Sequence, residues 1–128
     1  MAYPSGSGSE RLQRGTIHNQ TVSADTSFRF DGGIAATGTS TYAVPANHII
    51  TVLKIIITEV SNAARTFQLI VIAGGVNMNL VYQQSVLAKD TFIWNEKIVL
   101  HPTDKLLLGS SASSNFDVHY TYVDQDWS

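Results

Sequence analysis

The stretch His-Ile-Ile-Thr-Val-Leu-Lys-Ile-Ile-Ile-Thr-Glu-Val, residues 48–60, decides the fold class of this chain. Nine of its thirteen residues are isoleucine, valine or threonine. Side chains that branch at Cβ are restricted in a helix and pack well on a pleated sheet, so they favour extended backbone. Residues 48–60 are therefore predicted to form one long β-strand, buried on both faces in its middle, rather than a helix.

Turn signals bound this strand on both sides. Residues 61–64, Ser-Asn-Ala-Ala, are predicted to be a turn, after which residues 66–73 return as a strand that ends at Gly74-Gly75. On the other side, residues 39–44 are predicted to be a strand that stops at Pro45, because proline has no N–H to donate to a ladder.

The rest of the chain from about residue 25 repeats this style, with a period of two and short turns, and no segment with a helical period. Seven to nine strands can bury their apolar faces only as two packed sheets. The fold class expected is all-β, an antiparallel sandwich that is jelly-roll-like. The remaining strand candidates are residues 28–30, 79–86, 91–100 (one strand, or two broken near Asn95), 105–108 and 116–122.

Length and composition narrow the function classes. The 128 residues suit one domain, and charged residues make up 14% of the chain against about 25% in ordinary globular proteins. With a net charge of −2 and eight scattered basic residues, the chain is not expected to bind nucleic acid. Cysteine is absent, which excludes disulfides, thiolate zinc sites and cysteine nucleophiles. No apolar run approaches the roughly 20 residues that span a bilayer, and no classical export signal is present, so we expect a soluble protein and no membrane partner.

The first 24 residues differ from the body and are expected to form a flexible N-terminal arm, with residues 25–128 as a single sandwich domain. Residues 4–9 have linker composition. The sparse apolar pattern that follows could pair as an edge strand, remain disordered, or become ordered on a neighbouring subunit with its arginines against an acidic surface. The residues expected to make such inter-subunit contacts are Arg11, Leu12, Arg14 and Ile17, with Val22 as a further anchor.

Catalytic and metal-binding patterns are not found in the sequence. No two of the four histidines lie closer than 18 residues apart, whereas zinc ligands commonly occur at short spacing. The carboxylates fall mostly at predicted turns, and no nucleophile elbow or phosphate-binding loop is present. Asp117 and His119 share one face of a predicted strand, which more often marks a solvated face than a site. The sequence predicts no enzyme, no cofactor and no metal.

Trp127, the penultimate residue, is expected to be a C-terminal anchor, because a tryptophan at a chain end is costly to leave in water. Two dockings are open for it. Its indole can pack on the body of its own chain, or it can anchor a neighbouring subunit, a role in which tryptophan is enriched.

Several short segments together carry a family resemblance, and the first and the last of them are the most distinctive. They are residues 4–14 (PSGSGSERLQR), 41–46 (TYAVPA), 48–52 (HIITV), 92–97 (FIWNEK), 103–106 (TDKL) and 123–127 (VDQDW). In these segments the chain resembles the small β-rich virion proteins of tailed bacteriophages. The resemblance implies a structural component of the virion without enzymatic activity.

Three function classes follow. The first is a capsid decoration (cement) protein that binds the major capsid protein lattice and sibling subunits, stabilises the head, and forms a homo-oligomer, with a trimer favoured. It would be made in the host cytoplasm and sit on the outer capsid surface of the virion. The second is a neck, tail or fibre-associated component, including a receptor-binding head, although the lack of heptads and collagen-like repeats argues against a fibre shaft. The third is a β-sandwich enzyme or lectin-like binder unrelated to phage.

Overall fold

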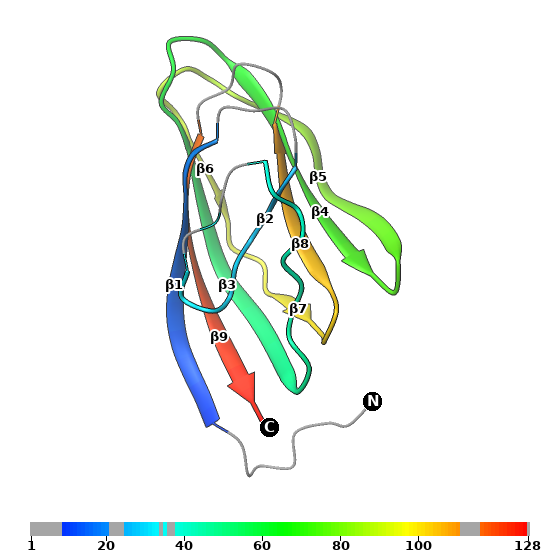
Figure 1. Cartoon of the computed structure of the whole chain (residues 1–128). Helices are drawn as coiled ribbons and strands as arrows, with labels where there is room; N and C mark the ends of the chain where they lie inside the picture. Colours follow the sequence, from blue (N-terminus) through cyan, green and yellow to red (C-terminus); the bar gives the residue numbers. More distant parts are fainter. Residues whose placement is uncertain (1–8, 21–24, 34, 36–37, 111–115, 128) are drawn as a thin grey trace.

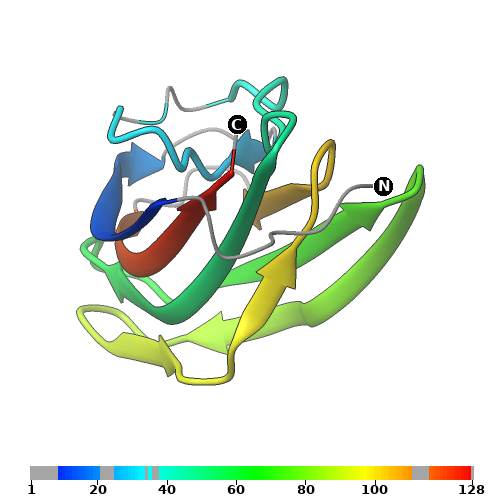
Figure 2. The same cartoon turned by 90° about the horizontal axis from the view of Figure 1, so that it is seen from below.

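The computed structural model describes residues 9–20, 25–33, 35, 38–110 and 116–127. Within these ranges every regular element is a β-strand, and nine strands form two antiparallel sheets that stack face to face (Figures 1 and 2). The predicted antiparallel β-sandwich is confirmed. In this described part of the chain, no helix is long and apolar enough to cross a membrane.

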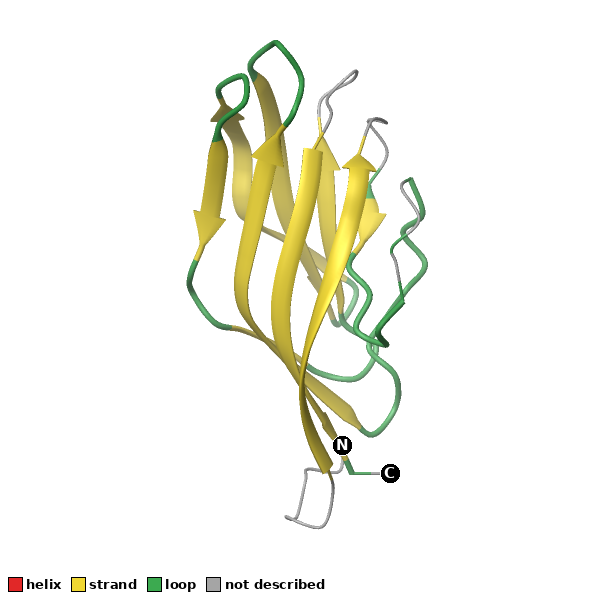
Figure 3. Ribbon diagram, turned by 90° about the vertical axis from the view of Figure 1, so that its left-hand side faces the viewer, coloured by secondary structure: helices red, strands yellow, loops and turns green. Residues whose placement is uncertain are grey.

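One sheet has the strand order β1-β9-β3-β6, with β7 also paired to β3, and the other has the order β2-β8-β4-β5. Figure 3 shows the first sheet from its outward side. The order of the strands in the two sheets is that of a double Greek-key jelly roll, with β7 as an extra short strand; β4 and β5 form a hairpin within one sheet. The first sheet contains β1 (Ser9–Gln20), β9 (Phe116–Asp126), β3 (His48–Glu59), β6 (Thr91–Trp94) and β7 (Ile98–Leu100). The second contains β2 (Thr26–Ser27), β8 (Lys105–Ser110), β4 (Arg65–Ala73) and β5 (Val76–Val86).

Strand β3 is as long as the sequence predicts and is paired on both sides, with β9 along one edge and with β6 and β7 along the other. Its inward side chains, which include Ile50, Ile55 and Ile57, have no exposed surface. On the opposite face Lys54 is exposed and Ile56 is only half-buried. The prediction that β3 is buried on both faces is wrong, because no further layer in the described chain covers the outward side of this sheet.

An aromatic cluster fills the end of the core nearest β1. Tyr120 and Tyr122 of β9 stack on each other, and Phe28 and Phe30 pack edge-on against them, with ring centroids 4.8–5.9 Å apart. The Tyr120 hydroxyl donates to the backbone oxygen of Arg29 at 2.6 Å and accepts from its backbone N–H at 2.9 Å.

This hydroxyl explains why residues 28–30 are not the strand that their alternation predicts. Both backbone groups of Arg29 are used by Tyr120 rather than by a neighbouring strand, although both phenylalanines still point into the core. The strand predicted at residues 39–44 is also absent from the described residues of that stretch. There, Val44 makes two isolated backbone bonds, to Asp104 and Thr103, that do not extend into a ladder.

The predicted flexible arm is wrong for its second half, because Ser9–Gln20 is strand β1 and pairs antiparallel with β9 from Ser9 opposite Asp126 onward. The alternative that this stretch pairs as an edge strand is confirmed. Gly15 lies directly against the ring of Tyr120, so close that a Cβ at this position would collide with the ring. Ile17 is 1% exposed within the core. The rest of the predicted arm, residues 1–8 and 21–24, lies outside the described residues.

Candidate functional site

The outward side of the five-stranded sheet carries a continuous set of side chains that we call the outer face. Because directly opposed residues of antiparallel strands point to the same side, the strand register defines its rows. Thr121 of β9, for example, lies opposite both Arg14 of β1 and Lys54 of β3. The outer face consists of Glu10, Leu12, Arg14, Thr16 and His18 of β1; Asp117, His119, Thr121, Val123 and Gln125 of β9; Ile49, Thr51, Lys54, Ile56 and Thr58 of β3; Thr91 and Ile93 of β6; and Val99 of β7.

The outer face is formally neutral, whereas the whole chain carries a net charge of −2. It holds two permanent cations, Arg14 and Lys54, and two carboxylates, Glu10 and Asp117, which gives a formal charge of 2 − 2 = 0 with histidines neutral. The carboxylate of Asp117 is already paired with the Nδ1 of His18 at 3.1 Å. Arg14 and Lys54 lie in one row on either side of Thr121, so the positive charge of the face is concentrated in that row.

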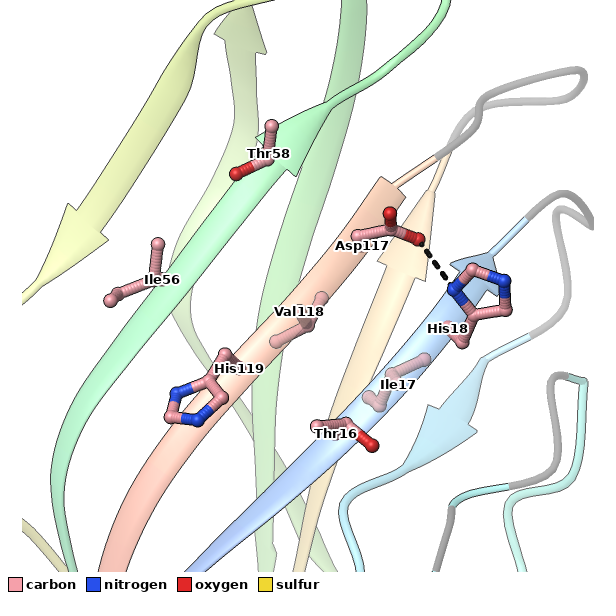
Figure 4. A pocket seen from close by; sticks show the side chains of 8 residues that line it. All are labelled: Thr16, Ile17, His18, Ile56, Thr58, Asp117, Val118 and His119. Carbon is pink, nitrogen blue, oxygen red and sulfur yellow. Dashed lines mark ion pairs between the residues drawn. The ribbon is translucent and has the colours of Figure 1, made fainter.

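Two shallow hollows open side by side on the outer face, and His119 borders both. The first, about 430 Å³, is bordered by β1, β9 and β3, from which Thr16, His119 and Ile56 form one row (Figure 4). The second, about 480 Å³, is lined by Leu12, Arg14 and Thr121 together with Gly32 of the neighbouring loop. Because of these two hollows the outer face is not flat, and side chains of a partner can fit into them.

Exposed apolar side chains flank these polar rows. Leu12 is 70% exposed, Val99 53% and Ile93 49%. A surface that combines apolar side chains with a few charges and hydroxyls has the composition of a protein-binding face. Both side chains of the His18–Asp117 pair are exposed to solvent. Among the described residues, no group of three metal-ligating side chains is arranged to hold an ion.

Of the four arm residues expected to contact a neighbouring subunit, the structure brings two to the outer face. Leu12 and Arg14 are exposed there. Ile17 is buried in the core of its own chain, so it cannot serve as an inter-subunit contact, and that prediction is wrong. Arg11 instead lines a separate small hollow with His48 and Asp124.

Beside this small hollow, the end of β9 is held to the start of β3. The imidazole of His48 lies between two carboxylates of β9, with its Nδ1 2.7 Å from Asp124 and its Nε2 3.7 Å from Asp126. The backbone N–H of Trp127 donates to the oxygen of Asn47 at 3.1 Å, and its indole is half-buried. This contact favours docking of Trp127 on its own body, and its anchoring of a neighbour remains a prediction.

Sequence reasoning missed Lys54, His18 and His119 as members of one surface. The alternation of β9 does show that Asp117 and His119 share a side. It does not show that Asp117 pairs with His18, because that contact depends on the register of β1 against β9, two strands a hundred residues apart in the sequence.

No protein-family model and no curated protein sequence matches the chain. Among solved structures, the chain is similar in fold to a subunit of Bacillus endospore appendages, described as disulfide-linked pili, with a TM-score of 0.54 and 10% identity over 100% of this chain and 97% of that chain. It is also similar to the globular domain of zebrafish complement 1qA protein, with a TM-score of 0.52 and 9% identity over 87% of this chain and 94% of that chain. A chain of the infectious bursal disease virus particle matches at a TM-score of 0.41 and 12% identity, over 91% of this chain and 35% of that chain. These likenesses show the fold alone.

Proposed function

We propose that the chain is a structural protein of a tailed-bacteriophage virion, a decoration (cement) protein that binds the capsid lattice and stabilises the head. The observation that carries the proposal is the outer face, an uncovered sheet surface in which two exposed cations, Arg14 and Lys54, flank Thr121 in one row. The resemblance of the first and last sequence segments to small phage virion proteins supplies the virion context. The rigid all-β body supports a role in static assembly.

The outer face defines the chemistry of the partner. Arg14 and Lys54 stand on either side of Thr121 and fit an acidic patch on the capsid, while Leu12 and Ile93 fit apolar side chains beside it. Contacts of this kind are individually weak and are screened by salt. On a shell they repeat at every lattice position, so saturation of the lattice stabilises the head by mass action.

A rebinding experiment tests this assignment. Virions are stripped of the chain and separated into heads and tails, and each fraction is incubated with purified protein and sedimented. We expect the wild-type chain to bind heads, and more weakly as salt increases. Binding to tails instead of heads overturns the decoration role.

A double charge reversal tests the outer face itself. Arg14→Glu combined with Lys54→Glu places like charges against an acidic partner, and we expect binding to heads to fall at least about tenfold, which corresponds to about 1.4 kcal/mol. The matched control is Lys89→Glu combined with Lys105→Glu, which makes the same change in net charge off the outer face, at the exposed turn before β6 and on β8 of the other sheet. An equal loss in both double variants shows that only net charge matters and contradicts the assignment.

A further inference from the structure

Strand β5 has an open edge and an unusual composition. It is the last strand of its sheet, so among the described residues one of its edges has no partner strand. Its eleven residues contain neither a charged residue nor a proline. Four of its large apolar side chains are exposed: Val76 60%, Met78 47%, Leu80 37% and Tyr82 64%.

Natural proteins usually protect such edges with charges, prolines or bulges, because an open strand pairs readily with another chain. The other long outer strand of the sandwich, β1, is protected in this way. It carries Glu10, Arg11 and Arg14, and the backbone N–H of Ala35 donates to the oxygen of Thr16 on its outer side. The contrast between the two strands indicates that the β5 edge is kept open for pairing.

We propose that β5 pairs antiparallel with β5 of a second copy of this chain, about a two-fold axis at Met78. In that register Asn77 lies opposite Asn79 of the second copy and Met78 opposite its Met78, while Val76 meets Leu80 of the second copy at the first bulge. The two four-stranded sheets become one continuous eight-stranded sheet, which is within the usual size of open sheets.

The register follows from the sequence of the regular part of the strand. Val76 and Met78 lie opposite Ala73 and Val71 of β4 and so share their side of the sheet, while Asn77 lies opposite Ile72 and faces the other way. A two-fold axis through a residue places apolar side chains opposite apolar ones and asparagine opposite asparagine. An axis between residues would mismatch every pair.

Bulges limit the regular part of β5 to Val76–Asn79. The register with β4 shifts at Leu80 and again before Gln84, and Gln83 has a positive φ of 49°. A bulge bends and twists its strand, so residues from Leu80 onward diverge from a straight partner. The second half of β5 is protected in the usual way, and only its first half is open.

A second copy fits this edge better than the acidic partner proposed for the outer face. An uncharged strand that meets itself brings no like charges together. The pairing uses a different sheet from the outer face, so it does not rest on the proposed function. It also produces a dimer, in contrast to the trimer favoured from the sequence.

Analytical sedimentation of the full chain over a concentration series tests the association. We expect a monomer–dimer equilibrium for the wild type. Met78→Lys, which sets two like charges against each other at the axis, is expected to stay monomeric where the wild type is dimeric. Ser85→Lys, on the same strand beyond the bulges, is the matched control and is expected to dimerise like the wild type. A wild type that is monomeric throughout, or an oligomer indifferent to Met78→Lys, overturns the proposal.

The absence of cysteine from the chain allows a second test that does not depend on a charged variant folding. Residues directly opposed in an antiparallel pair have Cα atoms about 4.5–5.5 Å apart, within the range that a disulfide spans. Met78→Cys is therefore expected to form a disulfide-linked dimer under mild oxidation, whereas Ser85→Cys is expected to remain unlinked. Equal linking of the two variants, or none at residue 78, contradicts the proposed axis.

Discussion

Replacement of Gly15 by alanine tests whether β1 is part of the folded body. A Cβ on Gly15 would collide with Cζ and the hydroxyl of Tyr120 and lie 2.5 Å from its Cε2, whereas carbon atoms in contact are normally about 3.5–4.0 Å apart. The ring cannot swing away freely, because its hydroxyl is bonded to both backbone groups of Arg29.

The expected cost combines three terms. Overpacking of this kind typically destabilises by about 1–3 kcal/mol. Each hydrogen bond to Arg29 that is lost if the ring moves adds roughly 1 kcal/mol. Against these, a glycine-to-alanine change normally gains about 0.4–1 kcal/mol by restricting the unfolded chain. The net expectation is a loss of about 2 kcal/mol in the free energy of unfolding.

Urea unfolding followed by tryptophan fluorescence measures this loss. For an m-value of about 2 kcal/mol per molar, the midpoint is expected to fall by about 1 M. Gly33→Ala is the control, since its added Cβ would meet only the flexible ends of the Arg29 and Asp31 side chains. In a Tyr120→Leu background the cost of Gly15→Ala is expected to shrink, which isolates the contact. An unchanged or raised midpoint for Gly15→Ala alone is the result expected of a flexible arm and would refute the packing of β1.

Three further outcomes are expected. Burial raises the pKa of Tyr42 to about 12 and also raises the pKa of Tyr120, whereas a tyrosine in an unfolded chain has a pKa of about 10. The stability that these two residues contribute is therefore fully present below pH 10 and falls as the pH rises toward 12. Urea midpoints that match on both sides of pH 10 would contradict this. Leu69→Ala, at a core position with no exposed surface, is expected to cost about 2–5 kcal/mol in the same unfolding assay, and a cost below 1 kcal/mol would argue against the described core. The hydrogen bond from Arg29 lowers the pKa of Asp31, so this carboxylate contributes stability above its unfolded pKa, and that stability is lost as the pH falls. Because the Arg29–Asp31 pair is exposed, Asp31→Asn is expected to lower the free energy of unfolding by less than about 1 kcal/mol at neutral pH. A larger loss would show that the pair is shielded from water.

Local chemistry explains what the sequence predicted well. Strand β3 follows from its β-branched residues, and the hairpin between β4 and β5 from Gly74-Gly75. Of the two alternatives for residues 91–100, the break near Asn95 is the one that the structure shows. Each of these features depends on residues adjacent in the chain. Nothing distant had to be known to predict them.

The errors arose where a distant partner decides the structure. Strand β1 resembles an arm because it offers only Ile17 and the bare backbone of Gly15 to the core, and the ring that covers Gly15 comes from the far end of the chain. Residues 28–30 alternate like a strand, but the hydroxyl of Tyr120 takes the bonds that a neighbouring strand would need. The outer face combines side chains from five strands, so its charge pattern becomes visible only when their registers are known.

The copy number of the chain in purified virions tests the central claim most directly. Quantitative mass spectrometry, with the major capsid protein as the internal standard, gives the ratio of the two proteins in intact particles. Decoration of the lattice predicts a fixed ratio of the same order as one chain per capsid protein or per capsomer. A ratio that amounts to a single ring of subunits, as closed cyclic symmetry at a neck or tail would require, contradicts the decoration role, as does the absence of the chain from the particle.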